Sequence, residues 1–308
     1  MRILSLKISI QVLVLSLTFS LSLSAERDYL SEAKKRTTQK EFLVFIQSLD
    51  KKEVLEFGRQ TGKWISNNWQ KIHDASWDIL MHIIINQYVR KYPEVCSYPS
   101  EFVAVFTSKE ENSVLRSAFI SWLREETKNI PNCFFYFQKP EEVFEALDRI
   151  VTDFSDDADV RTSAIITISS LSKITLWAHK HNLKWGNQYF TFLEKWLQQN
   201  ISHYLKILLN PKENRKVLID IINELQIMYE YGNTPTKIRI AQAVKKTLVE
   251  REQYLPDVQL AIFSWVIRVL KDSSIEQELT NFAIEHPEFA GNIKSILMDL
   301  KRIKNGQQ

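Results

Sequence analysis

A short segment near the middle of the chain, residues 153–171, places the strongest constraint on the fold. It opens with a run of aspartates, and an apolar stripe follows, made of Val160, Ala164, Ile168 and Leu171. Spacings of four, four and three residues put these side chains on one face of an α-helix. Acidic residues at the start of a helix stabilise it by interacting with the helix dipole. The segment therefore predicts a helix with one buried face, which needs neighbouring helices to cover it.

The chain contains few residues that interrupt helices. Only six glycines and eight prolines occur in 308 residues, whereas glycine alone makes up roughly 7% of an average protein. Long helices with short joints are expected. The same scarcity leaves little material for a glycine-rich phosphate-binding loop or for the strained turn that carries a hydrolase nucleophile.

The three- and four-residue apolar spacing recurs along most of the sequence. Two segments, 102–107 and 133–137, are rich in β-branched and aromatic residues, but each is too isolated to build a sheet, and we expect helix or loop there. In the first half, two helices are expected between 31 and 61, joined at 50–52, a third over 74–93, and a fourth that begins at 112. Residues 185–209 are expected to form one long or two short helices. Further helices are expected from 211 to a stop at 232–235, around 237–241, and from starts at 256, 274 and 287.

Three helices share a short motif. Asp159-Val160-Arg161 followed by Ala164 is similar to the second helix of a HEAT-type repeat, and the stretch ending at Ala118 loosely repeats it. The third copy is Lys237-Ile238-Arg239-Ile240-Ala241. Ala118 and Ala164 are 46 residues apart, within the roughly 40 to 47 residues of such repeats, and Ala164 and Ala241 are 77 apart, close to two repeats. The chain thus resembles HEAT or armadillo repeats over about residues 112–300. This resemblance implies an all-α fold, a right-handed α–α superhelix or solenoid of stacked antiparallel helix pairs.

The first 25 residues have the pattern of a secretory signal peptide. Arg2 and Lys7 precede an apolar run of about 16 residues, and small residues follow it. An uncleaved anchor is the alternative, but the run is shorter than the roughly 20 residues that a spanning helix needs. We expect the mature protein to begin at Ala25 or Glu26 and to be exported, to the periplasm or outside the cell. No later segment has the length and apolarity of a membrane span.

Residues 26–308 are expected to form a single all-α helical-repeat domain whose first hundred residues are less regular. Residues 1–25 carry two positive charges and no negative ones, so the formal net charge of +3 falls to +1 when they are removed. Strong electrostatic binding of nucleic acid is therefore not expected.

The sequence indicates no metal ion or other cofactor. Residues 153–159 alternate as in a calcium loop, but Ala158 and Ala164 stand where that loop needs a glycine and a bidentate glutamate. His179 and His181 are two residues apart on a predicted helix, so they point to nearly opposite sides. No catalytic residue is assigned from the sequence, although paired carboxylates brought together by folding leave no sequence motif.

The eight tryptophans are the most informative side chains for binding, because aromatic residues on the concave wall of a solenoid suit peptide, protein or glycan ligands. Trp77, Trp122 and Trp265 lie on apolar helical stripes and are assigned to the core. The tryptophans that fit such stripes less well, and are the candidates for an exposed binding surface, are Trp64, Trp69, Trp177 and Trp185.

The two cysteines, Cys96 and Cys133, are candidates for a disulfide in an oxidising compartment. Each follows a proline closely, so both are expected in joints between helices. Two buried thiols are the alternative.

The preferred function from the sequence is that of an exported, non-catalytic scaffold which binds a protein or peptide partner. The alternative is an all-α hydrolase or lyase that acts on envelope polysaccharide with two close carboxylates. The sequence identifies neither the partner nor the oligomeric state.

Overall fold

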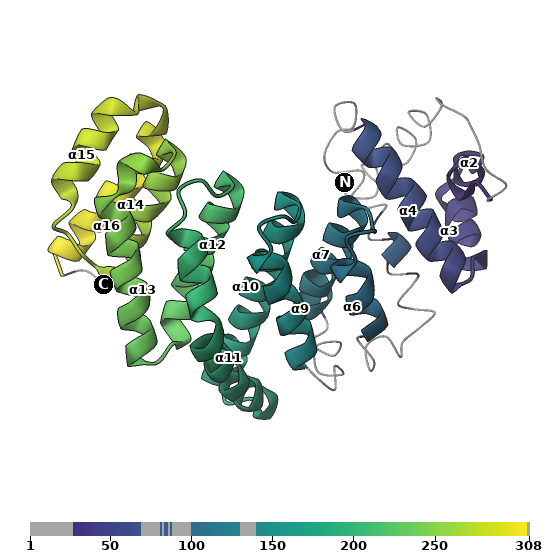
Figure 1. Cartoon of the computed structure of the whole chain (residues 1–308), viewed down its shortest axis with the longest axis horizontal. Coiled ribbons are helices and arrows are strands. Elements are labelled where there is room, and N and C mark those ends of the chain that lie inside the picture. Colours follow the sequence, from purple (N-terminus) through teal and green to yellow (C-terminus); the bar gives the residue numbers. More distant parts are fainter. Residues whose placement is uncertain are drawn as a thin grey trace. The chain divides into compact units, whose positions relative to one another are not determined.

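The computed structural model describes residues 27–68, 81, 83–85, 87, 100–129 and 140–306. Within these ranges the regular structure is entirely helical and no residue is in a strand (Figure 1). None of the helices in this described part is long and apolar enough to cross a membrane. The predicted signal peptide, most of the helix expected over 74–93, Trp69, Trp77 and both cysteines lie outside the described residues, so their predictions stay predictions.

Contacts between Cα atoms divide the chain into two compact units, Met1–Ile150 and Val151–Gln308. We call them unit 1 and unit 2 and describe each by itself. The predicted single domain over 26–308 stays a prediction.

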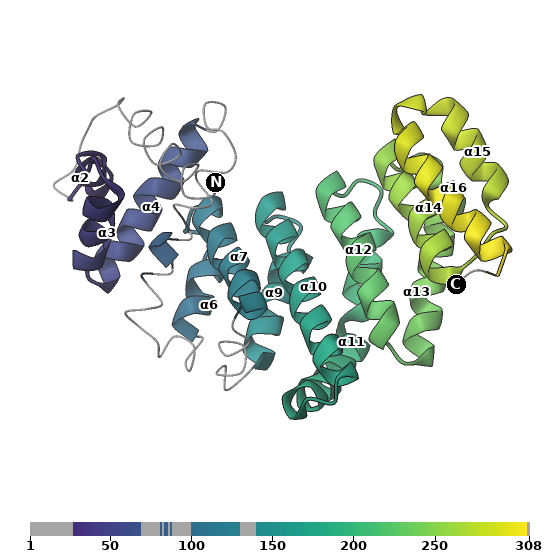
Figure 2. The same cartoon turned by 180° about the vertical axis from the view of Figure 1, so that it is seen from behind.

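In unit 1, α4 packs against both α2 and α7, and α6 packs against α7 (Figure 2). The rings of Phe42 and Phe45 meet the ring of Phe57 edge to face in its core. Residues 102–107, for which the sequence left helix or loop open, are helical. The described helices of this unit are α2 (Tyr29–Lys34), α3 (Gln39–Ser48), α4 (Lys51–Asn68), α6 (Ser100–Thr107), α7 (Ser113–Asn129) and α9 (Pro140–Thr152), the last of which continues two residues into unit 2.

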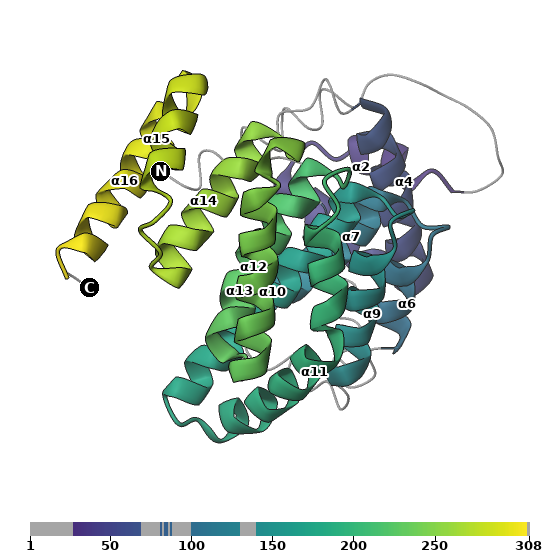
Figure 3. The same cartoon turned by 60° about the vertical axis from the view of Figure 1, so that its left-hand side comes forward.

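Unit 2 is a set of helices packed in two layers (Figure 3). In one layer α10 packs against α12, α12 against α14, and α14 against α16; α11 and α13 form the other layer and contact each other. The helices are α10 (Ala158–Lys180), α11 (Lys184–Leu208), α12 (Arg215–Tyr231), α13 (Thr234–Val249), α14 (Pro256–Leu270), α15 (Glu276–Glu285) and α16 (Ala290–Lys304).

Helix α10 has the buried face that the sequence predicts: Val160, Ala164 and Ile168 have no exposed surface. Asp157 caps the helix, because its side chain accepts hydrogen bonds from the backbone N–H groups of Asp159 and Val160. Near its other end α10 touches α11 so closely that a Cβ atom on Gly186 would lie 2.4 Å from the carbonyl carbon of Ala178. Glycine at 186 therefore sets the spacing between the two helices.

Two predicted boundaries are corrected. Helix α12 begins at Arg215 instead of Pro211, because the side chain of Asn214 caps it by accepting from the backbone N–H of Lys216. Helix α16 begins at Ala290, after a 3₁₀ turn at Pro287–Phe289. Residues 184–208 form one long helix, and Gly232 ends α12 as expected.

Candidate binding groove

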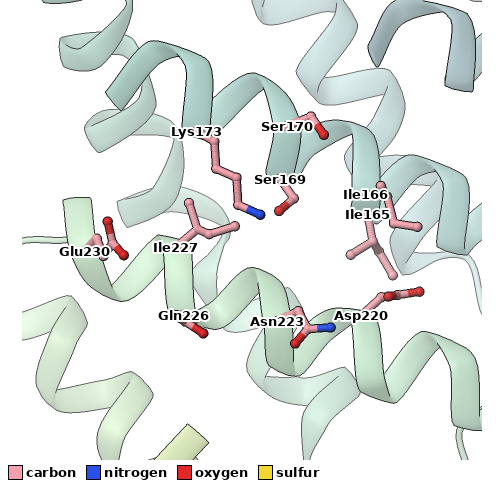
Figure 4. A pocket seen from close by; sticks show the side chains of 10 residues that line it. All are labelled: Ile165, Ile166, Ser169, Ser170, Lys173, Asp220, Asn223, Gln226, Ile227 and Glu230. Atoms are coloured by element: carbon pink, nitrogen blue, oxygen red, sulfur yellow. The ribbon is translucent and has the colours of Figure 1, made fainter. Parts of the chain in front are cut away.

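A groove of about 350 Å³ lies between α10 and α12 in unit 2 (Figure 4). It is open to solvent on one side, and both helices contribute polar and aliphatic side chains to it. Its lining consists of Ile165, Ile166, Ser169, Ser170 and Lys173 from α10 and Asp220, Asn223, Gln226, Ile227 and Glu230 from α12.

The lining follows from helical spacing. On each helix the lining residues recur at steps of three and four, so each set forms one face. Ile165 and Ile227 are buried against the helix–helix contact, whereas Lys173 and Glu230 are exposed. Figure 4 shows the ammonium group of Lys173 directed into the space between the helices, beside Ser169. The groove thus has an aliphatic floor and a charged rim.

A buried carboxylate lies next to this floor. Glu224 of α12 has no exposed surface, and neither of its carboxylate oxygens has a hydrogen-bond partner among the residues that the structure describes. Burial raises the pKa of Glu224 to about 8, and the nearby Ser169 hydroxyl and Lys173 ammonium offset only part of this shift. Ser169 and Lys173 both line the groove, so Glu224 is the polar group immediately beneath it.

Two further polar groups accompany Glu224. The hydroxyls of Ser172 and Tyr231 are buried and lack hydrogen-bond partners in the described part of the chain. Burial, and after it the charge of Glu224, raises the pKa of Tyr231 far above its usual value. Ser172 also favours the ionised form of Tyr231, so Glu224, Ser172 and Tyr231 form a buried polar cluster beside the groove.

Asp220 lies one helical turn before Glu224 and lines the groove itself. Burial raises the pKa of Asp220 to about 6, while the Thr162 hydroxyl and the charge of Lys216 favour the ionised form. Within one turn, α12 therefore carries two carboxyl groups that are harder to ionise than usual.

An exposed tryptophan lies on α10 one turn beyond Lys173, the last lining residue of that helix. Glu230 forms an ion pair with Lys180, at 3.7 Å. Trp177 is four residues after Lys173 and three before Lys180, so it occupies the face of α10 that meets Glu230. Its side chain is 55% exposed, and its ring lies against that of His181 with centroids 4.4 Å apart.

The structure places the four candidate tryptophans differently. Trp177 is exposed, Trp64 of α4 and Trp185 of α11 are half-buried, and Trp69 lies outside the described residues. Trp177 and Trp185 flank the joint between α10 and α11, whereas Trp64 belongs to unit 1. Trp122 and Trp265 are buried, as predicted.

Sequence reasoning missed the groove and its buried acid. A usable signal was present: Glu224 falls seven residues after Val217, three after Ile221 and four before Met228, which are buried positions of one apolar stripe. An acidic residue at such a position is rare unless it is paired or functional.

No group of three or more metal-ligating side chains occurs among the described residues. No protein-family model matches the chain, and neither the curated proteins nor the solved structures include a match to it.

Proposed function

We propose that this protein is an exported, non-catalytic helical-repeat scaffold that binds a segment of a protein or peptide partner along the α10/α12 groove. The observation that carries the proposal is the groove itself, with the exposed Trp177 on the same face of α10. Aromatic anchors beside a mixed polar and aliphatic surface are typical of peptide-binding sites.

Recurring arginine contacts support the repeat architecture. In unit 1 the Nε atom of Arg116 donates to the carbonyl oxygen of Phe106, ten residues upstream, at 2.8 Å. In unit 2 the Nε atom of Arg161 donates to the carbonyl oxygen of Val151, also ten residues upstream, at 3.0 Å. The two arginines are 45 residues apart in sequence, within the range of HEAT and armadillo repeats.

Ion pairs repeat in the same way. Arg59 of α4 binds Glu111, which precedes α7, and Arg161 of α10 binds Glu213, which precedes α12; each pair spans 52 residues. In both cases an arginine on one helix is joined to the acidic residue that precedes another helix packed against it, α7 against α4 and α12 against α10. Stacked helical pairs of similar length account for this recurrence.

The hydrolase alternative is motivated by Asp220 and Glu224, whose raised pKa values are typical of catalytic acids. Their placement favours the binding role. Glycosidic acids flank the substrate and contact it, whereas Glu224 has no exposed surface and both carboxyls lie on one helix face. Lys173 and Ser169 stand on the facing wall.

Site-specific photo-crosslinking tests the proposal. A photoreactive phenylalanine analogue replaces Trp177 in the full-length protein produced in its native cell, and crosslinked products are identified by mass spectrometry. We expect one dominant peptide-containing adduct from position 177. The matched control carries the analogue at Val249, which is 81% exposed on α13 and does not line the groove.

The same adduct from both positions, or none from position 177, contradicts the proposal. An activity assay covers the alternative. The assay measures the release of reducing sugar from envelope polysaccharide. If the wild-type protein releases sugar and Asp220→Asn does not, the scaffold proposal is wrong and the protein is an enzyme.

A further inference from the structure

We propose that the α10/α12 groove recognises a cationic side chain of the partner, a lysine or arginine, whose charged end lies at Asp220 and Ser169 in the groove, next to the buried Glu224. This inference rests on the proposed function and specifies the chemistry of the partner. It starts from the imbalance of charge around the groove.

Acidic groups outnumber basic ones at this site. Asp220, Glu224 and Glu230 all belong to α12, and Lys173 is the basic residue among the lining side chains. Glu230 already has Lys180 as an ion-pair partner. Lys173 forms no ion pair with any described residue, and its side chain is exposed. The charges of Lys173 and Lys216 favour the ionised forms of Glu224 and Asp220, respectively, but within the described residues neither lysine forms an ion pair with these carboxyls, and Lys216 pairs with Asp159 instead.

The burial of Glu224 is a second reason to expect a cation in the groove. It is fully buried beside two lining residues, and both of its oxygens lack partners within the described chain. An unpaired carboxyl in such a place costs stability unless it gains a counter-charge or a proton. A cation that enters from the groove and reaches Ser169 would supply that counter-charge.

The rest of the lining suits the stem of a basic side chain. Ile165, Ile166 and Ile227 provide aliphatic contact for its methylene groups. Ser169 and Asn223 provide oxygen acceptors for an ammonium or guanidinium group. Farther along α10, the exposed face of Trp177 is suited to a second cation through a cation–π contact.

Calorimetric titration with three blocked peptides tests the inference. The probes are acetyl-(Gly-Lys-Ala-Gly)₃-amide and the same sequence with norleucine or with glutamate in place of lysine. We expect the lysine peptide to bind the full-length mature protein at least tenfold more tightly than the norleucine peptide. Asp220→Asn and Glu224→Gln should each weaken its binding roughly tenfold.

Proton release gives a second readout. A cation beside Glu224 favours the ionised carboxylate, so binding at pH 7 should release most of a proton, measured from the difference between phosphate and Tris buffers. Glu224→Gln should abolish this release. Glu252→Gln, an exposed substitution outside the groove, is the control and should change neither affinity nor proton release.

Lys173→Gln keeps the test decisive if Glu224→Gln fails to fold, because Lys173 is exposed. It should tighten binding of the lysine peptide by removing a repelling charge. Preference for the glutamate peptide, lost in Lys173→Gln, overturns the cation inference and leaves the scaffold proposal standing. Absence of lysine-peptide binding also overturns it; the scaffold proposal fails as well only if the crosslink at position 177 is absent.

Discussion

Unit 2 buries two ionisable groups in opposite ways. Arg161, at the start of α10, is 2% exposed and has a partner for each part of its guanidinium group. Its Nη1 and Nη2 atoms donate to the two oxygens of Glu213 at 2.7 and 2.9 Å, and its Nε atom donates to the carbonyl of Val151. Glu224 lies on α12, two to three helical turns farther along the contact between α10 and α12. It is equally buried, and its carboxylate oxygens have no hydrogen-bond partner among the described residues.

The electrostatics of the two sites differ accordingly. Burial acts to raise the pKa of Glu213, but hydrogen bonds from Arg161 and from the backbone of Asn214 outweigh it and hold that pKa below its usual value. At Glu224 burial prevails. Glu213 is thus a buried carboxyl with its hydrogen bonds made within the protein, whereas Glu224 is a buried carboxyl without them. The second kind is the better indicator of a binding site.

Breaking the satisfied site should have the largest effect on stability. Arg161→Met keeps much of the side-chain volume but leaves the carboxylate of Glu213 buried without its partner and frees the carbonyl of Val151. We expect a loss of about 3–5 kcal/mol in the free energy of unfolding, measured by urea denaturation of the full chain followed by circular dichroism.

Arg215→Met is the matched control. Arg215 pairs with Asp257 at 2.8 Å, but its side chain is 63% exposed, so its removal should cost less than about 1 kcal/mol. Similar losses in the two variants would mean that the pairing of Arg161 has no special structural role.

The helix that carries Arg161 was predictable because its causes are local, whereas the ion pair of Arg161 with Glu213, 52 residues along the chain, was not predicted. The acidic residues that cap α10 and the apolar stripe after them predicted a helix over these positions, and Arg161 was the best match to the repeat motif. Helix existence was predicted well for the same reason, since apolar spacing is fixed by the helix itself. The start of α12 was predicted four residues too early, because a proline signal was preferred over the capping side chain of Asn214.

The unsatisfied site was not accessible in the same way. The surroundings of Glu224 depend on α10, which brings Ser169 and Lys173 near its carboxyl, and the packing of these two helices is a tertiary fact. Trp177 could be selected as exposed from its position off the apolar stripe, but the sequence did not show that it lies one turn beyond a groove whose other wall is α12.

Stability against pH sharpens the comparison. The pKa of Glu224 is raised in the folded state. The protonated carboxyl therefore contributes its full stabilisation to the folded state below the pKa of the unfolded chain, about 4.5, and this stabilisation is lost as pH rises through about 8. Between pH 5 and 8 the loss should be on the order of 3 kcal/mol. Lys173 across the helix pair and Asp220 and Tyr231 on α12 are the other titratable groups near this carboxyl.

Glu224→Gln should remove most of that pH dependence and make the protein more stable than the wild type at pH 8. Urea denaturation at closely spaced pH values measures both. An unchanged slope between pH 5 and 8 would show that Glu224 finds a partner in solution, and the contrast with Arg161 would disappear.

The smallest effect is expected at Asp220, which is half-buried and lies between the two extremes. Its pKa is raised to about 6 by burial, so its stabilising contribution is present below pH 4 and is lost as pH rises from about 4 to 6. Because solvent reaches the groove, Asp220→Asn should change stability at pH 7 by only about 1 kcal/mol, in the stabilising direction. The same denaturation series, now read between pH 4 and 6, measures it. A loss of stability in Asp220→Asn would mean that Lys216 or Thr162 interacts strongly with the carboxylate of Asp220. Asp220 would then resemble Glu213, and Glu224 would be the one carboxyl of the three without a partner among the described residues.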